Sequence, residues 1–345
     1  MEKLNLFDDS NNELAHLDFG DSNSVHYQGE LGNFWYNPKE FEIIDDHWKG
    51  EHLHYCGKGE SVNLPEGCKN TRYMFSRCKL PDRFTLGDNF NTSKVTNMEG
   101  MFYGCKLPAG FKLGNKFYTS RVTNMDSMFS CCKLPAGFTL VDKFNTCNVT
   151  NMNNMFRECE LPYWFTLGSK FNTSNVINME GMFSGCKLPK GFTLGNKFDT
   201  SNVESMLSMF CECELPAGFT LGDKFNTSNV ESMSSMFCEC ILPAGFTLGD
   251  KFDTSNVTKM GWMFHHCKLP DGFTLGDKFD TSNVKCMLDM FSECRLPARF
   301  TLGDKFDTSS VKDMKGMFIQ CRYNNISIQE YFKTDDIKSI IALLK

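Results

Sequence analysis

Apolar residues recur along most of this chain at a fixed interval. A cysteine stands at every 27th position from Cys78 to Cys321, without an insertion. The unit that ends in each cysteine follows the pattern L-P-x-G-F-T-L-G-D-K-F-D/N-T-S-N-V-T-x-M-x-x-M-F-x-x-C, and nine copies fill residues 79–321. A constant period of this length indicates stacked structural repeats, in which each unit packs only on its neighbours.

The end of each unit predicts a short α-helix. In M-x-x-M-F-x-x-C, which occupies residues 98–105 of the first copy, the apolar side chains are spaced i, i+3, i+4 and i+7 and so share one helical face. Earlier in the unit, residues 84–86 alternate apolar, polar and apolar before Gly87, which predicts a very short strand and a turn. We therefore expect one short parallel strand and one short helix in each coil.

A single unit is too small to fold by itself. Its large apolar side chains cannot offset the conformational entropy that is lost when the whole unit becomes ordered. Equivalent residues of neighbouring units must therefore stack in continuous buried columns. The predicted fold is a repeat solenoid, and its core columns start at Phe84, Leu86, Met98, Met101, Phe102 and Cys105.

The two ends of the chain differ from the repeats. Residues 61–78 have the pattern of a truncated capping repeat, and residues 322–345 predict a C-terminal helical cap with a capping-box pattern at 327–330. Residues 1–60 are an acidic N-terminal head, with 13 Asp and Glu, 4 Lys and Arg, and a net charge of −9. This head is too apolar for a disordered segment, so we expect it to fold. Its large apolar residues are Trp35, Tyr36, Phe41, Ile43, Ile44 and Trp48.

The repeat resembles that of the BspA-type leucine-rich-repeat surface proteins, in the branch with F-D-T-S-N-V-T-N-M-x-x-M-F-x-x-C repeats. The pattern is nearly intact in residues 90–105 and again in residues 252–267, and the resemblance covers residues 74–321. It implies a leucine-rich-repeat-like solenoid that is used for adhesion or protein binding. The usual L-x-x-L-x-L-x-x-N signature of leucine-rich repeats is absent from the chain.

Charge and hydropathy argue against two classes of function. The 345 residues include 36 Lys and Arg and 42 Asp and Glu, a net charge of −6, which argues against nucleic acid as the main partner. The longest apolar runs, such as residues 340–344, are far shorter than a membrane span, and residues 1–9 lack the apolar centre of an export signal. We expect no nucleic-acid partner and no membrane span.

The 17 cysteines favour a reduced protein. Ten of them form the 27-residue column on the apolar side of the predicted helix, where a free cysteine behaves as a small hydrophobic residue. The others lie at different positions of the unit, and among them Cys211 and Cys238 are one period apart. So many unpaired thiols favour a reducing compartment such as the cytoplasm, whereas the family resemblance implies the cell surface.

Candidate metal ligands are few. His47, His52, His54 and Cys56 form a cluster of metal-ligand types at short spacing, but they match no strong zinc pattern. A column of aspartates that starts at Asp88 is interrupted by Asn and Ser, so turn acceptors explain it better than calcium ligands do. No nucleophilic, acid–base or phosphate-binding constellation stands out. We expect no enzymatic activity and no cofactor.

Two functional hypotheses follow. In the first, the chain is a monomeric protein-binding or adhesion solenoid whose specificity lies in outward residues that vary between repeats, because exposed aromatic residues and arginine often anchor interfaces. In the second, the repeats are a scaffold or spacer, and the acidic head is the active part, with its histidine cluster as a weak metal candidate. A threonine column that starts at Thr85 raises a third and weaker hypothesis, ice or carbohydrate binding. The candidates for partner contact are Arg83, Tyr103, Tyr163, Trp164, Trp262 and Arg299.

Overall fold

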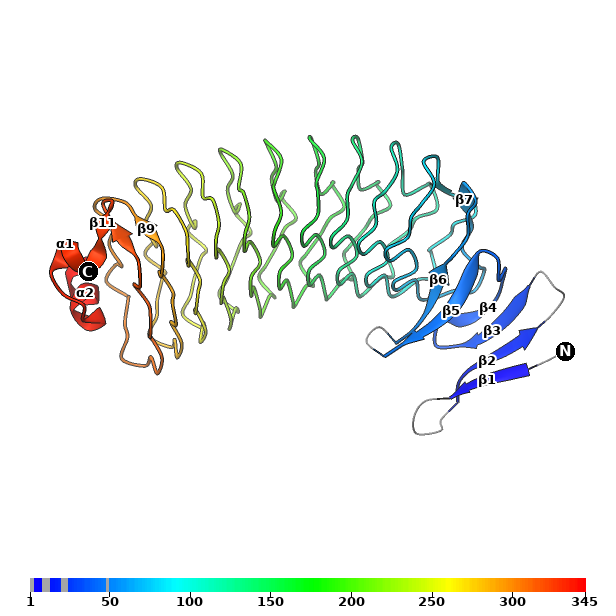
Figure 1. Cartoon of the computed structure of the whole chain (residues 1–345), viewed down its shortest axis with the longest axis horizontal. Helices are drawn as coiled ribbons and strands as arrows, with labels where there is room; N and C mark the ends of the chain where they lie inside the picture. The colour runs from blue at the N-terminus through cyan, green and yellow to red at the C-terminus, as the bar shows by residue number, and fades with distance from the viewer. Residues whose placement is uncertain (1–2, 8–12, 20–23, 48–49) are drawn as a thin grey trace.

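The computed structural model describes the backbone of residues 3–7, 13–19, 24–47 and 50–345, and the side chains of residues 24–47 and 50–345. Trp48 lies outside the described residues. In Figure 1, a small group of strands at the N-terminal end leads into a long row of similar coils, and two helices lie at the C-terminal end. The molecule is therefore elongated along the direction in which the coils follow one another.

The strands of the N-terminal head are antiparallel. β1 (Lys3–Phe7), β2 (Glu13–Phe19), β3 (Val25–Gly29) and β4 (Gly32–Tyr36) form one sheet in that order, and β5 (Phe41–Asp46) pairs with β6 (Gly50–Tyr55). Side chains alternate along β4, so that Phe34 is buried, with its ring 5.0 Å from that of Tyr27. Of the residues expected in a core, Tyr36 and Phe41 are buried, Ile43 and Ile44 are partly buried, and Trp35 is exposed.

The head is bonded directly to the first coil, which is the truncated capping repeat of residues 61–78. The N–H of Tyr55 donates to the carbonyl oxygen of Met74 at 2.8 Å, and the ring of Tyr55 lies 5.5 Å from that of Phe75. β7 (Ser61–Val62) then pairs in parallel with β8 (Thr85–Leu86). β6 therefore covers the apolar end of the row of coils.

Neighbouring coils are joined at equivalent positions, 27 residues apart. Parallel bridges link Asn70 to Asn97 and continue at the same position as far as Asp313, and a second set follows the position of Lys106. Figure 1 shows the coils side by side, each in the same direction as the one before. The sheets are small and none of them is closed. Repeated units that are joined in this way fit a repeat protein.

The short helix that was predicted in each coil is not formed, and the prediction was wrong. In residues 98–105, every second backbone N–H donates to the carbonyl oxygen three residues earlier. The N–H groups between them donate to carbonyl oxygens of the next coil, as that of Phe102 does to Met128 at 2.9 Å. Gly100 and Gly104 have φ of 55° and 64°, a left-handed backbone that is incompatible with an α-helix. The segment is a run of tight turns, because hydrogen bonds between coils replace those within a helix.

The predicted strand forms in the first unit alone, where β8 pairs with β7. In the next unit, Gly110 and Gly114 turn the backbone through φ of 76° and 77° on either side of the equivalent segment, which leaves too few extended residues for a ladder. A short parallel pair occurs instead after the core cysteine, between β9 (Arg295–Leu296) and β10 (Arg322–Tyr323). The coil is therefore not a unit of one strand and one helix.

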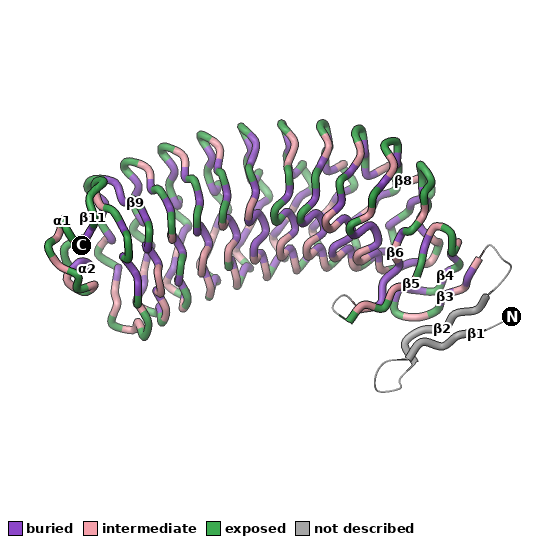
Figure 2. The backbone as a smooth tube through the Cα atoms, in the orientation of Figure 1, coloured by how far each residue is buried: buried purple, intermediate pink, exposed green. Residues whose placement is uncertain are grey.

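The predicted core columns are confirmed. Phe84, Met98, Phe102 and Cys105 are buried, as are nearly all their equivalents in later units. Figure 2 shows a buried stretch in every coil of the row. Phenylalanine rings stack from coil to coil, and those of Phe102 and Phe129 are 5.6 Å apart and nearly parallel, at 3°. The core is therefore continuous along the molecule.

A column of buried threonines accompanies this apolar core. Thr254 is fully buried, and its Oγ1 donates to the carbonyl oxygen of Asp280 in the next coil at 2.7 Å. The same bond recurs in other coils, for example from Thr119 to Asn145 at 2.8 Å. Because each hydroxyl satisfies a carbonyl of the neighbouring coil, the column adds a polar connection between coils without an unpaired buried group.

Two helices cover the last coil. α1 (Ile328–Phe332) follows β11 (Ile326–Ser327), which pairs with β10, and α2 (Ile337–Leu344) contacts α1. The N–H of Leu302 donates to the carbonyl oxygen of Leu344 at 2.9 Å. Among the described residues, no helix is long and apolar enough to cross a membrane. The buried residues of the two helices are Ile328, Ile340, Ile341 and Leu344.

The capping box expected at residues 327–330 does not form. Ser327 precedes α1, but its hydroxyl contacts the side-chain oxygen of Gln329 at 2.9 Å and caps no backbone N–H. The side chain of Asp336 caps α2 instead, and it accepts a hydrogen bond from the N–H of Ser339 at 2.9 Å. The longer helix is therefore the one whose N-terminus is stabilised.

Candidate functional site

Tyr163 and Trp164 form the most exposed aromatic pair among the predicted contact residues. Tyr163 is 59% exposed and Trp164 is 75% exposed. Their ring centroids are 4.7 Å apart and the rings are nearly perpendicular, at 78°. The pair therefore presents a joined apolar surface to solvent, which is the arrangement expected of an interface anchor.

The backbone of Trp164 makes this exposure unusual. Its φ is 69°, in the left-handed region, where a bulky side chain is strained. Glycine stands at the equivalent position in most other coils, for example Gly137 and Gly191, with φ of 76° and 77°. The coil therefore favours glycine at this position, and the tryptophan gains little packing in exchange for the strain.

The other predicted contact residues are not gathered with this pair. Arg83 and Arg299 stand at the position of Trp164 in other coils, three and five coils away from it. At the spacing of adjacent strands, these separations are roughly 14 Å and 24 Å. Tyr103 is partly buried, beneath the guanidinium of Arg77 at 5.5 Å, and Trp262 is 39% exposed on the turn segment. The six residues therefore do not form one patch.

The four candidate metal ligands of the head lie at different depths near β6. His52 is buried on β6, and its ring lies 6.0 Å from that of His54. The Nε2 of His54 is 3.8 Å from the Sγ of Cys78 in the first coil, whereas Cys56 and His47 are exposed. No group of potential metal ligands within the described part of the chain contains any of these four residues. His52 and His54 instead contribute to the contact between the head and the repeats.

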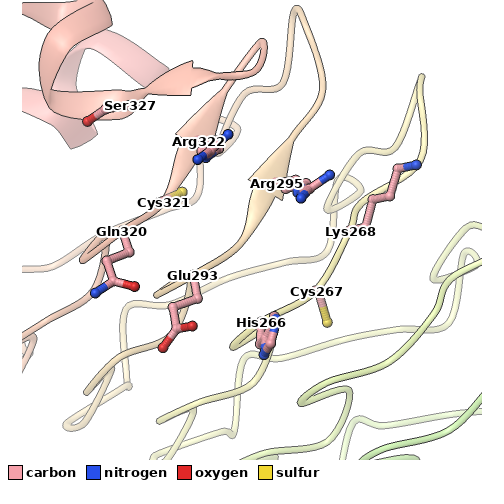
Figure 3. Close-up of a pocket in the computed structure, with 9 residues that line it drawn as sticks. All are labelled: His266, Cys267, Lys268, Glu293, Arg295, Gln320, Cys321, Arg322 and Ser327. Carbon is pink, nitrogen blue, oxygen red and sulfur yellow. The ribbon is translucent and has the colours of Figure 1, made fainter.

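A hollow of about 570 Å³, which was not predicted from the sequence, lies on the last coils. Figure 3 shows Lys268, Arg295 and Arg322 in a row along one side of it, from three successive coils. At the same position between residues 133 and 214, opposite charges alternate and form ion pairs, as Lys187 and Glu214 do at 2.6 Å. The signal in the sequence is the residue after the core cysteine, which is basic at the last three such positions, as it also is at the first three, Lys79, Lys106 and Lys133.

The core thiols are buried and bonded. All 17 cysteines are free thiols in the structure. The Sγ of Cys186 donates to the carbonyl oxygen of Phe156 at 2.8 Å, and burial raises the pKa of Cys186 to about 12. Burial likewise raises the pKa of Cys105 to about 12. These thiols therefore remain protonated at neutral pH and behave as packing groups.

One cluster of potential metal ligands does occur among the described residues. It consists of Cys238, Glu239 and His265, from two adjacent coils, and their ligand atoms all lie within 4.8 Å of one another. Cys238 stands outside the core cysteine column, and its spacing along the chain does not connect it with His265. Alignment of the units would have shown the link, because the two residues occupy the same position, 27 residues apart.

A family model described as "Mycoplasma protein of unknown function, DUF285" matches the chain three times, over residues 69–161, 136–241 and 246–344. Together these matches cover well over half of the chain, and all of them follow the head. Neither the comparison with curated proteins nor that with solved structures produced a match. The repeated match agrees with the 27-residue period, and both indicate a repeat protein.

Proposed function

The chain belongs to the family described as Mycoplasma protein of unknown function, DUF285, and from this premise we propose that it is a non-enzymatic, protein-binding solenoid. The parallel bridges between successive coils and the unbroken core support an extended, regular surface. The resemblance of the repeats to those of BspA-type surface proteins supports protein binding or adhesion as the use of that surface.

Trp164 is the observation that carries this proposal. Its side chain is 75% exposed and its backbone is left-handed, at the position where glycine serves in most other coils. Folding alone would favour glycine there. A large exposed ring that is strained in the free protein is better explained by a partner that covers it, and Tyr163, at 4.7 Å, extends the same surface.

The described side chains also support a function without catalysis. The hydroxyl of Ser292 lies 2.6 Å from the Nδ1 of His265, which is the distance of a nucleophile and its base. However, Ser292 is only 3% exposed, so a substrate could not reach its hydroxyl. The hollow beside Lys268 is also lined by Arg295, Arg322 and Glu293, so basic groups outnumber acidic ones there.

The proposal is tested by comparing the proteins that immobilised variants retain from extracts of the source cells. The double variant Tyr163→Ala with Trp164→Gly removes the aromatic pair and restores the residue type of other coils. The control is Ile241→Lys, which changes an apolar residue that is 62% exposed into the lysine found at equivalent positions. We expect the wild type and the control to retain a common set of proteins that the double variant loses at least tenfold.

Equal retention by all three proteins would contradict the proposal, because the aromatic pair would then contribute nothing to binding. Circular dichroism of each variant checks that the fold is kept. Photocrosslinking from position 163 to a retained protein then identifies the partner directly, and a crosslink that forms equally well from position 241 would assign the contact to another surface.

A further inference from the structure

The cluster of Cys238, Glu239 and His265 lies on the turn segments of two adjacent coils. The N–H of Glu239 donates to the carbonyl oxygen of His265 at 2.8 Å, so the two segments are held together through their backbones. Cys238 is buried, His265 is partly buried and Glu239 is exposed, which places the cluster at the surface with its sulfur on the inner side. An ion could therefore reach the cluster from solvent.

A fourth potential ligand comes from the preceding coil. Cys211 is partly buried and stands one period before Cys238. Cys211, Cys238 and His265 occupy the same position in three successive coils, so their side chains project from the same face. The neighbouring carboxylates of Glu212 and Glu239 make the surroundings attractive to a cation.

The fold does not require these residue types. Ser184 and Ser292 stand at the same position in the coils on either side, and both are buried there. Serine is therefore sufficient for packing at this position. Two cysteines and a histidine replace it in three consecutive coils, which a packing requirement does not explain.

The second coordination shell is also present. The hydroxyl of Ser292 lies 2.6 Å from the Nδ1 of His265, and it accepts or donates according to the tautomer of the ring. Ser292 in turn donates to the carbonyl oxygen of Asp289 at 3.1 Å. Contacts of this kind hold the imidazole of a metal ligand in a fixed orientation.

We propose that Cys211, Cys238, Glu239 and His265 bind a zinc ion. Two thiolates, an imidazole and a carboxylate are ligands that Zn²⁺ takes in tetrahedral sites, at about 2.3 Å for sulfur and about 2.0–2.2 Å for nitrogen and oxygen. Such bonds place ligand atoms about 3.3–3.8 Å apart. The ligand atoms of Cys238, Glu239 and His265 already lie within 4.8 Å of one another, so these three need only small side-chain rotations. Cys211 is outside that group and would complete the site from the preceding coil. The site would connect three successive coils and is independent of the proposed protein-binding function.

The test uses the full chain, reduced with a phosphine and freed of metal. Titration with Zn²⁺ by calorimetry is expected to show one tight site per chain, and Co²⁺ is expected to give the thiolate charge-transfer and tetrahedral absorption bands. The double variant Cys211→Ser with Cys238→Ser introduces the residue type of the flanking coils and should weaken Zn²⁺ binding by at least about a hundredfold, with loss of the Co²⁺ bands. Ser292→Ala should weaken it by about tenfold to a hundredfold.

Cys147→Ser is the matched control, because serine occupies that position in most other coils and Cys147 lies outside the cluster. It should bind Zn²⁺ as the wild type does. The proposal is overturned if the wild type shows no stoichiometric site, or if the double variant keeps the Co²⁺ bands, which would place the metal on other thiols. A disulfide between Cys211 and Cys238 in the protein as isolated under reducing conditions would also overturn it.

Discussion

Left-handed backbone positions restrict the residues that each coil accepts. Every coil makes several such turns, and glycine occupies many of them, as at Gly218 and Gly222 with φ of 76° and 82°. Where another residue takes the position, its side chain adds strain that glycine would avoid. Trp164 and Arg299 have a positive φ at a position where glycine stands in most other coils, so the backbone does not explain their large side chains.

Trp164→Gly is expected to stabilise the free protein. Relief of the left-handed strain should outweigh the larger entropy of the unfolded chain, for a net gain of roughly 0.5–1 kcal/mol in the free energy of unfolding. Urea unfolding with the denaturant midpoint as the readout measures this gain. Tyr163 does not have a left-handed backbone, so Tyr163→Ala should change the urea midpoint little. A loss above 1 kcal/mol for Trp164→Gly would mean that the ring packs on its own protein.

The buried thiols predict how stability depends on pH. Burial raises the pKa of Cys186 and of Cys105 from the usual value near 9 to about 12. A raised pKa means that the folded state retains the proton more strongly than the unfolded state, so stability is intact below pH 9 and falls as pH rises towards 12. The urea midpoint should decrease steadily above pH 9. In a separate measurement, alkylation at pH 8 should label the exposed Cys131 quickly and the core thiols slowly. A midpoint that increases over this range would contradict the assignment.

At the scale of the element, one apolar pattern can correspond to two different backbones. The spacing of residues 98–105 places Met98, Met101, Phe102 and Cys105 on one side of either a helix or a run of tight turns. Burial was therefore predicted correctly, while the helix was not. The paired glycines Gly100 and Gly104 were the signal for turns, because two glycines in eight residues weaken a helix and permit a left-handed backbone. The bonds between coils that decide the outcome are invisible in a single unit.

The candidate sites could be predicted from the sequence only in part. The exposure of Tyr163 and Trp164 followed from their departure from the repeat, since a residue that the core does not use has to face outward. The cluster of Cys238, Glu239 and His265 could not be found from spacing along the chain. Metal-binding motifs are recognised by ligands at short separations, whereas Cys238 and His265 are 27 positions apart. Such sites become visible when the units are stacked.

A pair of substitutions at Ser235 distinguishes turns from a helix in solution. Ser235 has φ of 55°, at the position of Gly100 and Gly181. In a left-handed turn, Ser235→Gly should be more stable than Ser235→Ala by about 1 kcal/mol, whereas in a helix interior the order reverses by about the same amount. Thermal unfolding of the two variants measures the order. Greater stability of the alanine variant would support the helix that the structure lacks.

At the scale of the whole molecule, each coil is stabilised mainly by its two neighbours. Hydrogen bonds, stacked rings and the threonine column all join residues about one period apart. Stability should therefore depend on the number of interfaces between coils and on the two covers, the head and the C-terminal helices. An interior coil can be removed without exposing the core, whereas a cover cannot.

Two deletions of similar length test this dependence. Removal of residues 106–132 joins Cys105 to Lys133, an equivalent position, so the flanking coils can pack on each other as before. We expect this variant to unfold cooperatively, with a denaturant slope lower by about a tenth, because less surface is exposed on unfolding. Removal of residues 322–345 leaves Met317, Phe318 and Cys321 uncovered. This deletion should lower the melting temperature more than the interior deletion does, and it should cause association that increases with protein concentration. If the interior deletion proved the more damaging of the two, the coils would not be interchangeable and the description by nearest neighbours would fail.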